Sequence, residues 1–376
     1  MLSSFYIKNY RNLKELQISS LHQVNLISGK NNTGKSSLLE AISIYANKGS
    51  IESIIANLSE RNEYIDPRYS DAETNILQDN ITSLSSLFYN RKFSFNNEDK
   101  IEIGYTELKG LISLQFTHLK ELNKYNEEVE LNSSVTAKRR FVKRDSNSND
   151  INDSIIAFEI KVDEHSRILL LQNTLDIYKR PSTSVPTLFR NSHFIHTNNT
   201  DKRINSSLFD NITLTDREQY VIEALRIIEP NTERIAFIDN NMKERVAVVK
   251  LANTKDVVSI SSMGDGINRI LTIILALVNC SDGYLLIDEF ENGLHYTVQE
   301  QLWTIIFKLA KELNIQVFAT THSNDCISSF SKVLNEKDNK SQGKYIRLDN
   351  VNGEIRQVEF SSDELNIADQ QEIELR

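Results

Sequence analysis

Apolar runs along the chain alternate between strand-like and helix-like spacing, and they follow a regular order near both ends of the sequence. Residues 24–28 form an apolar run typical of a buried strand, and a helix-like run follows at 37–42. A second series consists of strand-like runs at 257–260, 283–287 and 315–320, with helix-like runs at 267–278 and 297–313 between them. Strands that alternate with helices are typical of a largely parallel sheet with helices on its faces. The pattern predicts an α/β fold with a central mixed or parallel sheet.

The middle of the chain departs from this order. Between about 50 and 185, strand-like runs at 101–105, 155–162 and 168–171 mix with helix-like runs at 51–58 and 71–87. Two further strand-like pieces, 345–348 and 355–360, precede a short acidic segment that begins at Ser361. We therefore expect one α/β domain made of residues 1–50 and 185–376, interrupted by an α+β insertion at 51–184.

A loop between the first predicted strand and helix carries the clearest chemical signal. The pattern G-x-x-x-x-G-K-S runs from Gly29 to Ser36, in the strand–loop–helix setting of a phosphate-binding loop. Glycines let backbone N–H groups turn toward phosphate oxygens, and the following helix directs its positive end at the same anion. Lys35 can reach the outer phosphates, and the Ser36 hydroxyl can bind Mg²⁺. The predicted nucleotide-binding residues are Gly29, Asn31, Asn32, Thr33, Gly34, Lys35, Ser36 and Ser37.

Two acidic residues, Asp288 and Glu289, follow directly after the strand-like run at 283–287. In an enzyme with a phosphate loop, the carboxylate associated with Mg²⁺ lies at the C-terminal end of a neighbouring parallel strand. Asp288 is therefore predicted to hold Mg²⁺, directly or through water, and Glu289 to polarise the attacking water as a general base. An acidic pair after a strand is a weak signal alone, and it gains its meaning from the phosphate loop.

Two more positions extend the predicted site. His322 follows the strand at 315–320, where it is well placed to contact the γ-phosphate. Upstream of the acids, a second glycine-rich turn stands at the start of a helix, a position suited to anions. One phosphate loop already serves the local nucleotide, so we expect this turn to cap a nucleotide held by another copy of the chain. Its predicted binding residues are Ser262, Gly264, Asp265 and Gly266.

Composition limits the possible partners. The 376 residues are 39% hydrophobic and 25% charged, as in an ordinary soluble globular protein, and no apolar run approaches the roughly 20 residues of a membrane helix. We therefore expect a cytoplasmic location and no membrane partner. Two cysteines, Cys280 and Cys326, fit a reducing compartment better than a disulfide framework. The net charge of −9 argues against a general polyanion binder.

One basic cluster, Lys138–Arg144, stands out against this acidic background, and a polar run follows it at 145–150. Two interpretations remain open. The cluster could contact DNA or an acidic partner, or it could be a solvated surface loop, and the composition favours the loop.

Taken in order, these motifs resemble those of an ABC-type ATPase: the phosphate loop, the turn at 262–266, the acids Asp288 and Glu289, the stretch 291–295, and His322. Within that class the chain is similar to the Rad50, SMC, RecF and OLD group. It is most similar to the bacterial AAA15/AAA21-type ATPases of OLD-like proteins and phage-defence systems. The opening at 5–13 is similar to that group's first strand. Residues 29–32 and 288–295 are similar to that group's later motifs. The resemblance covers about 1–50 and 185–376 and is weak between them.

The resemblance implies a mechanism in which two copies close around two ATP molecules. In that mechanism Lys35 and the loop backbone hold the phosphates, and Ser36 and Asp288 hold Mg²⁺. Glu289 acts as base, His322 senses the γ-phosphate, and Ser262 and Gly264 come from the second copy. Hydrolysis removes the ligand that both copies share, so the dimer can loosen.

Two departures from the class are visible. The turn reads Ser-Met-Gly-Asp-Gly, where the class usually has Ser-Gly-Gly followed by Gln or Glu. No Q-loop glutamine stands out. Gln115 is a candidate, although a solvent-facing strand residue is the favoured interpretation.

Several functions fit these motifs. The chain shows no sustained heptads, so the coiled-coil arm of Rad50 or SMC is expected to be absent. Few residues follow His322, so we expect the chain to lack the TOPRIM nuclease domain that OLD proteins fuse behind the ATPase. The leading hypothesis is an ATPase that forms a homodimer or higher homo-oligomer in a bacterial defence module and controls a separate effector, such as a TOPRIM-type nuclease. The alternatives are a RecF-like repair ATPase that clamps DNA, and a transporter ATP subunit, against which the OLD-like opening argues. Fold alone does not decide between them.

Overall fold

The computed structural model describes residues 1–66, 76–95, 99–105, 110–121, 141–143, 154–172, 192–197, 202–240, 244–252, 254–371 and 373–375. The chain divides into two compact units. The first comprises residues 1–5, 16–47 and 186–376, and the second comprises residues 6–15 and 48–185. The structure thus groups residues 6–15 with the second unit, whereas the sequence pattern assigned them to the α/β domain. The expected boundaries at 50 and 185 otherwise stay a prediction.

The first unit is built on a six-stranded sheet with the strand order β16-β15-β3-β14-β13-β9. All neighbouring pairs are parallel except β15 and β16. Every residue of β3, β13 and β14 is buried, as expected for parallel strands covered on both faces. The predicted α/β fold with a central mixed sheet is confirmed. The strands are β3 (Val24–Ser28), β9 (Ser192–Ile195), β13 (Tyr284–Ile287), β14 (Gln316–Thr320), β15 (Gly343–Val351) and β16 (Glu354–Phe360).

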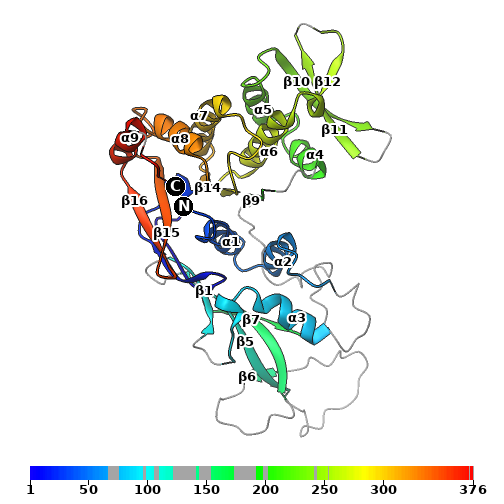
Figure 1. The fold of residues 1–376 in the computed structure, drawn as a ribbon. Coiled ribbons are helices and arrows are strands. Elements are labelled where there is room, and N and C mark those ends of the chain that lie inside the picture. Colours follow the sequence, from blue (N-terminus) through cyan, green and yellow to red (C-terminus); the bar gives the residue numbers. More distant parts are fainter. Residues whose placement is uncertain are drawn as a thin grey trace. The chain divides into compact units, whose positions relative to one another are not determined.

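Helices cover both faces of this sheet. Figure 1 shows α1 on one side and α6, α7 and α8 on the other. Aromatic packing joins the second layer to the sheet, because Trp303 on α7 stacks on Phe290, just after β13, with ring centroids 3.9 Å apart. Phe330 on α8 meets the same indole edge-on. Such pairs contribute about 0.5–1.5 kcal/mol beyond their burial. The helices are α1 (Lys35–Ala46), α6 (Asp265–Asn279), α7 (Tyr296–Glu312) and α8 (Asn324–Leu334).

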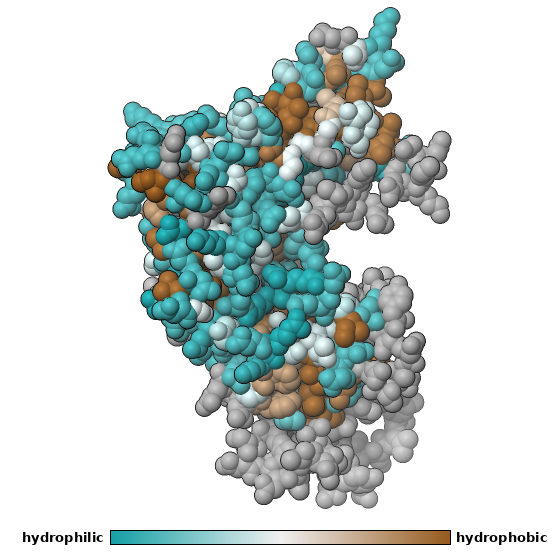
Figure 2. Space-filling model, in the orientation of Figure 1, coloured by the Kyte–Doolittle hydropathy of each residue, from teal (hydrophilic) through white to brown (hydrophobic). Residues whose placement is uncertain are grey.

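A three-stranded antiparallel sheet in the first unit was not predicted as a whole. The sequence pattern placed a strand only at 257–260, which the structure resolves into β12 (Val257–Ser259) and a 3₁₀ turn, η5 (Ile260–Ser262). The other strands are β10 (Thr232–Asn240) and β11 (Glu244–Leu251). Ile235 and Val249 face the core beside α4 (Lys202–Asp210) and α5 (Arg217–Leu225), whereas Ile238 remains 45% exposed. Figure 2 shows hydrophobic surface over this part of the unit.

The end of the described chain returns to the central sheet. β15 and β16 form a hairpin through Asn352 and Gly353, whose positive φ values of 56° and 87° suit the tight turns that match strand twist. The acidic segment after Ser361 is a helix, α9 (Ser362–Gln370), which the sequence pattern did not predict. Ser361 and Glu364 form a capping box at its start, which explains why so polar a segment is helical.

The second unit contains a sheet with the order β2-β1-β4-β5-β7-β8, and β6 pairs with β5. Phe116 and Phe158 pair across β5 and β7, and both are buried. Phe5 and residues 16–18, at the ends of β1 and β2, are grouped with the first unit. The strands are β1 (Phe5–Tyr10), β2 (Leu13–Ile18), β4 (Ile101–Gly104), β5 (Ile112–Glu121), β6 (Phe141–Lys143), β7 (Ser154–Val162) and β8 (His165–Leu170). The helical segments are α2 (Ile51–Glu60), α3 (Ile76–Ser85) and a short 3₁₀ turn, η3 (Tyr89–Arg91).

Two sequence-based interpretations fall within this unit. Residues 138–140 and 144 of the basic cluster lie outside the described residues, as do the side chains of 141–143. Gln115 is half-buried on β5, and its Nε2 donates to Glu159 Oε2 at 2.6 Å. It is therefore a partly exposed strand residue, and its side chain alternates with the buried residues Leu114 and Phe116.

Among the described residues, no helix is both long and apolar enough to cross a membrane.

Candidate nucleotide site

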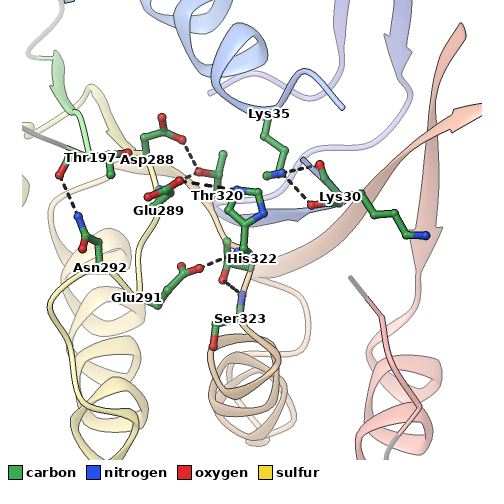
Figure 3. Close-up of polar contacts among 12 residues, drawn as sticks. Lys30, Lys35, Thr197, Asp288, Glu289, Glu291, Asn292, Thr320, His322 and Ser323 are labelled. Carbon is green, nitrogen blue, oxygen red and sulfur yellow. Dashed lines mark hydrogen bonds and ion pairs between the residues drawn. The ribbon is translucent and has the colours of Figure 1, made fainter. Parts of the chain in front are cut away.

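Strand register brings the predicted site residues of the first unit to one edge of the central sheet. In the parallel pairs, Ile27 lies opposite Thr320 and Ile287 lies opposite Ala319. The C-terminal ends of β3, β13 and β14 are therefore level. The loops that follow these strands carry the phosphate loop, the acidic pair and His322, and Figure 3 shows their side chains converging. This edge is where parallel α/β sheets bind ligands.

The backbone of the phosphate loop adopts conformations that glycine makes accessible. Gly29 has φ of 146°, and a Cβ atom there would lie 2.4 Å from the carbonyl oxygen of Leu348 on β15. Gly34 has φ of 85° and precedes the first turn of α1. Asn32 also has a positive φ, of 66°, and Thr33 Oγ1 donates to the carbonyl oxygen of Lys30 at 2.9 Å. The loop is thus folded tightly over the N-terminus of α1, with Asn31 and Asn32 exposed and Ser36 half-buried.

Lys35 is the buried cation of the loop, with only 5% of its surface exposed. Its Nζ donates to the carbonyl oxygens of Gly29 at 2.7 Å and Lys30 at 3.0 Å. Burial lowers the pKa of Lys35 to about 8, although the charges of Asp288, Glu289 and Glu291 act in the opposite direction. A desolvated ammonium group inside a glycine-rich loop at a helix N-terminus is a donor set that fits phosphate oxygens.

The acidic pair is held by a residue that the motif analysis did not single out. Thr320 Oγ1 donates to Asp288 Oδ1 at 2.6 Å and accepts a hydrogen bond from the Glu289 backbone N–H at 2.9 Å. Glu289 has φ of 48°, in the left-handed region that non-glycine residues seldom adopt. Its side chain remains 39% exposed, so water can reach the carboxylate.

A buried arginine holds the same turn from the other side. Arg269 on α6 is 8% exposed, and its Nη2 donates to the carbonyl oxygens of Asp288 at 3.0 Å and Glu289 at 3.2 Å. Its Nη1 donates to the carbonyl oxygen of His196 at 3.4 Å. Burial lowers the pKa of Arg269. Both peptide groups of the acidic pair are thus fixed to the helix that follows the second glycine-rich turn.

His322 lies beside the predicted base. Its Nε2 is 3.7 Å from Glu289 Oε1, and its backbone N–H donates to Glu291 Oε1 at 2.7 Å. The structure therefore brings together the histidine, the acidic pair and Lys35, as the sequence predicted. It adds Glu291, which ties the loop after β13 to the loop after β14.

The second glycine-rich turn has its own local contacts. Ser262 Oγ donates to the carbonyl oxygen of Ser259 at 2.7 Å, and Gly264 has φ of 102° at the start of α6. A Cβ atom on Gly264 would meet no atom within 4 Å, whereas one on Gly266 would lie 3.1 Å from the Gly293 carbonyl oxygen. The turn thus packs against the stretch at 291–295 through Gly266 and leaves Gly264 open. The side chain of Asp265 lies outside the described residues, and binding across two copies stays a prediction.

The predicted metal ligands fit a magnesium ion. In the portion of the chain that the structure describes, no group of three or more His, Cys, Asp or Glu side chains could hold a metal by itself. Mg²⁺ usually keeps several waters and binds through one or two protein groups plus substrate phosphates. Ser36, in the first turn of α1, and Asp288, directly after β13, are such a pair.

Two functional candidates, Thr320 and Arg269, escaped the motif analysis, whereas Glu291 was included in it only as the first residue of the stretch 291–295. Arg269 is the only charged residue in the largely apolar run at 267–278, which was a signal for a buried interaction, because an unpaired buried cation is costly. Thr320 gave no such signal, since a threonine at the end of a strand is common.

The comparison with known families agrees with this geometry. A family model, AAA_15, described as an AAA ATPase domain, matches residues 1–327. The chain belongs to this AAA ATPase domain family. The ABC-type ATPase class indicated by the motifs is therefore supported, whereas the OLD-like subgroup stays a prediction.

The individual proteins that match this chain over most of its length share less than a third of its residues. An "ATP/GTP phosphatase" of Helicobacter pylori is 28% identical over 367 residues, which cover 93% of this chain and 92% of that protein. An uncharacterized protein of Methanocaldococcus jannaschii, MJECL10, is 47% identical over 45 residues, or 12% of this chain and 20% of that protein. Among solved structures, an SMC head bound to the C-winged helix domain of ScpA aligns over 96% of this chain and 97% of that chain. Its TM-score is 0.50 at 13% identity, so the likeness shows the fold.

Proposed function

We propose that this chain hydrolyses ATP with Mg²⁺, closes as a homodimer around two nucleotides, and uses that cycle to control a separate effector protein. The observation that carries the proposal is the convergence of Lys35, Asp288, Glu289 and His322 where the parallel strands of the central sheet end. The name of the Helicobacter pylori relative, an ATP/GTP phosphatase, supports nucleotide hydrolysis.

The chemistry follows from the positions of the side chains. Lys35 and the backbone N–H groups at 29–37 would bind phosphate oxygens, and Ser36 and Asp288 would hold Mg²⁺, which supplies charge neutralisation at the phosphates. Glu289 is exposed enough to accept a proton from water. His322, 3.7 Å from that carboxylate, can donate to developing negative charge on the same side of the site.

Dimerisation is proposed from the second glycine-rich turn. Gly264 is open at the N-terminus of α6, and helix N-termini favour anions. A second copy could place this turn against a phosphate held by the first. Nucleotide would then stabilise the dimer by mass action, and hydrolysis would release it.

Control of an effector rests on resemblance. OLD-like proteins join such an ATPase to a nuclease, and the SMC head of similar fold was solved with a protein partner bound. We propose that the partner here is a separate protein, for which a nuclease is the first candidate, and that the setting is bacterial defence against phage.

Two measurements test the proposal in sequence. The purified chain should release phosphate from ATP only with Mg²⁺, and light scattering should show a shift from monomer to dimer with ATP. Tagged chain carrying Glu289→Gln should then retain a stoichiometric protein partner from host cells when ATP and Mg²⁺ are present, and the eluate should be assayed for nuclease activity. Absence of phosphate release would refute the enzyme. A self-dimer that carries only DNA would refute effector control.

The pKa of Lys35 predicts that ATP affinity depends on pH. Burial lowers that pKa to about 8, so the nucleotide-free site already disfavours the charged form that phosphate requires. Below about pH 8 the amine is protonated and affinity should be flat. Above it, binding must take up a proton, so the dissociation constant should rise by up to about tenfold per pH unit. Calorimetry between about pH 7.5 and 9.5, where the phosphates are fully ionised, measures both affinity and proton uptake. Constant affinity with no proton uptake would contradict the assignment.

A further inference from the structure

Thr320 contacts both members of the acidic pair with one hydroxyl group. Its single proton is directed at Asp288 Oδ1, 2.6 Å away, and its lone pair accepts from the Glu289 N–H at 2.9 Å. Thr320 is fully buried, and its carbonyl oxygen also accepts from the N–H of Phe290 at 2.9 Å. One residue at the end of β14 therefore fixes three consecutive residues after β13, as Figure 3 shows for the first two.

We propose that Thr320 is the positioning residue of the catalytic centre, and that its hydroxyl orients Asp288 for Mg²⁺ while holding Glu289 in the geometry of a base. This proposal rests on the proposed ATPase function. Groups behind a metal ligand fix its orientation, and their loss commonly weakens metal binding about 10- to 100-fold.

The proton direction sets the orientation of Asp288. Because Oδ1 accepts the Thr320 proton, the carboxylate cannot rotate freely, and Oδ2 has no hydrogen-bond partner within the described residues. That oxygen is available to a cation or to its bound water. A hydroxyl can donate and accept at once, which valine, although of the same shape, cannot do.

The acceptor side of the hydroxyl stabilises an unusual backbone. Glu289 has φ of 48°, a conformation that persists in non-glycine residues only when its surroundings enforce it. Thr320 enforces it at the Glu289 N–H, and Arg269 does so at the Glu289 carbonyl oxygen. Without the hydroxyl, the N–H loses its partner in a partly buried turn, and the carboxylate can leave the position facing His322.

A purely structural role is the competing explanation, because a buried threonine also packs through its methyl group. Three substitutions separate the two. Thr320→Val keeps the shape and removes the hydroxyl, Thr320→Ser keeps the hydroxyl and removes the methyl group, and Thr320→Ala removes both. Thr232→Val is the matched control, because Thr232 is 1% exposed and its hydroxyl donates to the Glu229 carbonyl oxygen at 2.8 Å, in the three-stranded sheet.

The primary readout is the Mg²⁺ dependence of nucleotide binding, measured with a fluorescent, non-hydrolysable ATP analogue in EDTA and over a Mg²⁺ titration. We expect Thr320→Val to raise the half-saturating Mg²⁺ concentration about tenfold and to leave binding in EDTA unchanged. Turnover at saturating Mg²⁺ and ATP should also fall, because Glu289 is no longer held. Thr320→Ser and Thr232→Val should match the unmodified chain. Trp303, the single tryptophan, stacks on Phe290 and reports by fluorescence whether the core is intact.

Each outcome decides the question. Equal Mg²⁺ dependence in Thr320→Val and the unmodified chain overturns the proposal, as does equal loss in Thr320→Ser and Thr320→Val. If Thr320→Val does not fold, the comparison of Thr320→Ala with Thr320→Ser isolates the hydroxyl in the same way. Failure of the proposed function is distinct, because the unmodified chain itself would then release no phosphate from ATP, whatever the Mg²⁺ dependence of the Thr320 variants.

Discussion

Replacing Glu289 by glutamine is expected to lower the turnover of ATP by about 100- to 10,000-fold, because an amide cannot accept the proton of the attacking water. Shape and backbone contacts are kept, since the Thr320 and Arg269 hydrogen bonds reach main-chain atoms of Glu289. ATP affinity should therefore persist. With hydrolysis blocked, the ATP-bound dimer should accumulate, and light scattering with ATP and Mg²⁺ will measure it together with a phosphate-release assay.

The control for this substitution is Glu300→Gln on α7. The Glu300 side chain is 53% exposed and pairs with Lys332 at 3.6 Å, so the same chemical change on the surface should leave turnover unaltered. Unchanged turnover in Glu289→Gln would remove Glu289 as the base. Loss of ATP binding would show instead that the Glu289 carboxylate is needed to bind ATP.

Truncation of Lys35 to alanine is expected to abolish ATP binding in the micromolar range. The Lys35 ammonium is the buried cation of the loop, and a charge-assisted contact contributes about 1.5–3 kcal/mol, so affinity should fall roughly 10- to 150-fold or more. Folding should survive, because the change also removes a buried charge whose desolvation lowers its pKa to about 8. Calorimetric titration with ATP measures the loss, and thermal unfolding monitors the fold.

Lys308→Ala provides the comparison for this second substitution. Lys308 lies on α7, is 50% exposed, and pairs with Glu223 at 3.5 Å. The Lys308→Ala substitution removes one positive charge from the same unit without changing the phosphate loop, so the affinity for ATP should be unchanged. Tight ATP binding by Lys35→Ala would refute the phosphate-loop assignment.

The elements that the sequence predicted best are those with a strong local pattern. The strands at 24–28, 283–287 and 315–320 and the helices at 267–278 and 297–313 all appear within two residues of their expected limits. Each is an uninterrupted apolar run or a clear helical repeat. The strand β10 was missed because it carries charged residues such as Glu233 and Arg234, so its apolar alternation is incomplete. Its partner β11 was missed with it. The helix α9 was missed because its stability comes from a capping box in a polar segment.

In the candidate site, too, the motif residues could be predicted from the sequence, whereas the contacts that hold them could not. Lys35, Asp288, Glu289 and His322 stand in recognisable strings next to strand ends, so their convergence could be inferred from parallel strands alone. The contacts that hold them are long-range in sequence. Thr320 meets Asp288 across 32 positions and Arg269 meets the same residue across 19, and no local pattern encodes such a pair.

By itself, the sequence determined that this chain has a phosphate loop, an acidic pair after a buried strand, and an α/β fold of the ATPase class. Those properties are encoded over short distances, in hydrophobic periodicity and in residue types at fixed spacing. Only the tertiary structure decided that Gly29 must be a glycine to pass the Leu348 carbonyl, and that Glu289 adopts a left-handed backbone held by Thr320 and Arg269. The physical reason is that strand order and helix packing bring these groups together through the burial of a shared core, which depends on the whole chain.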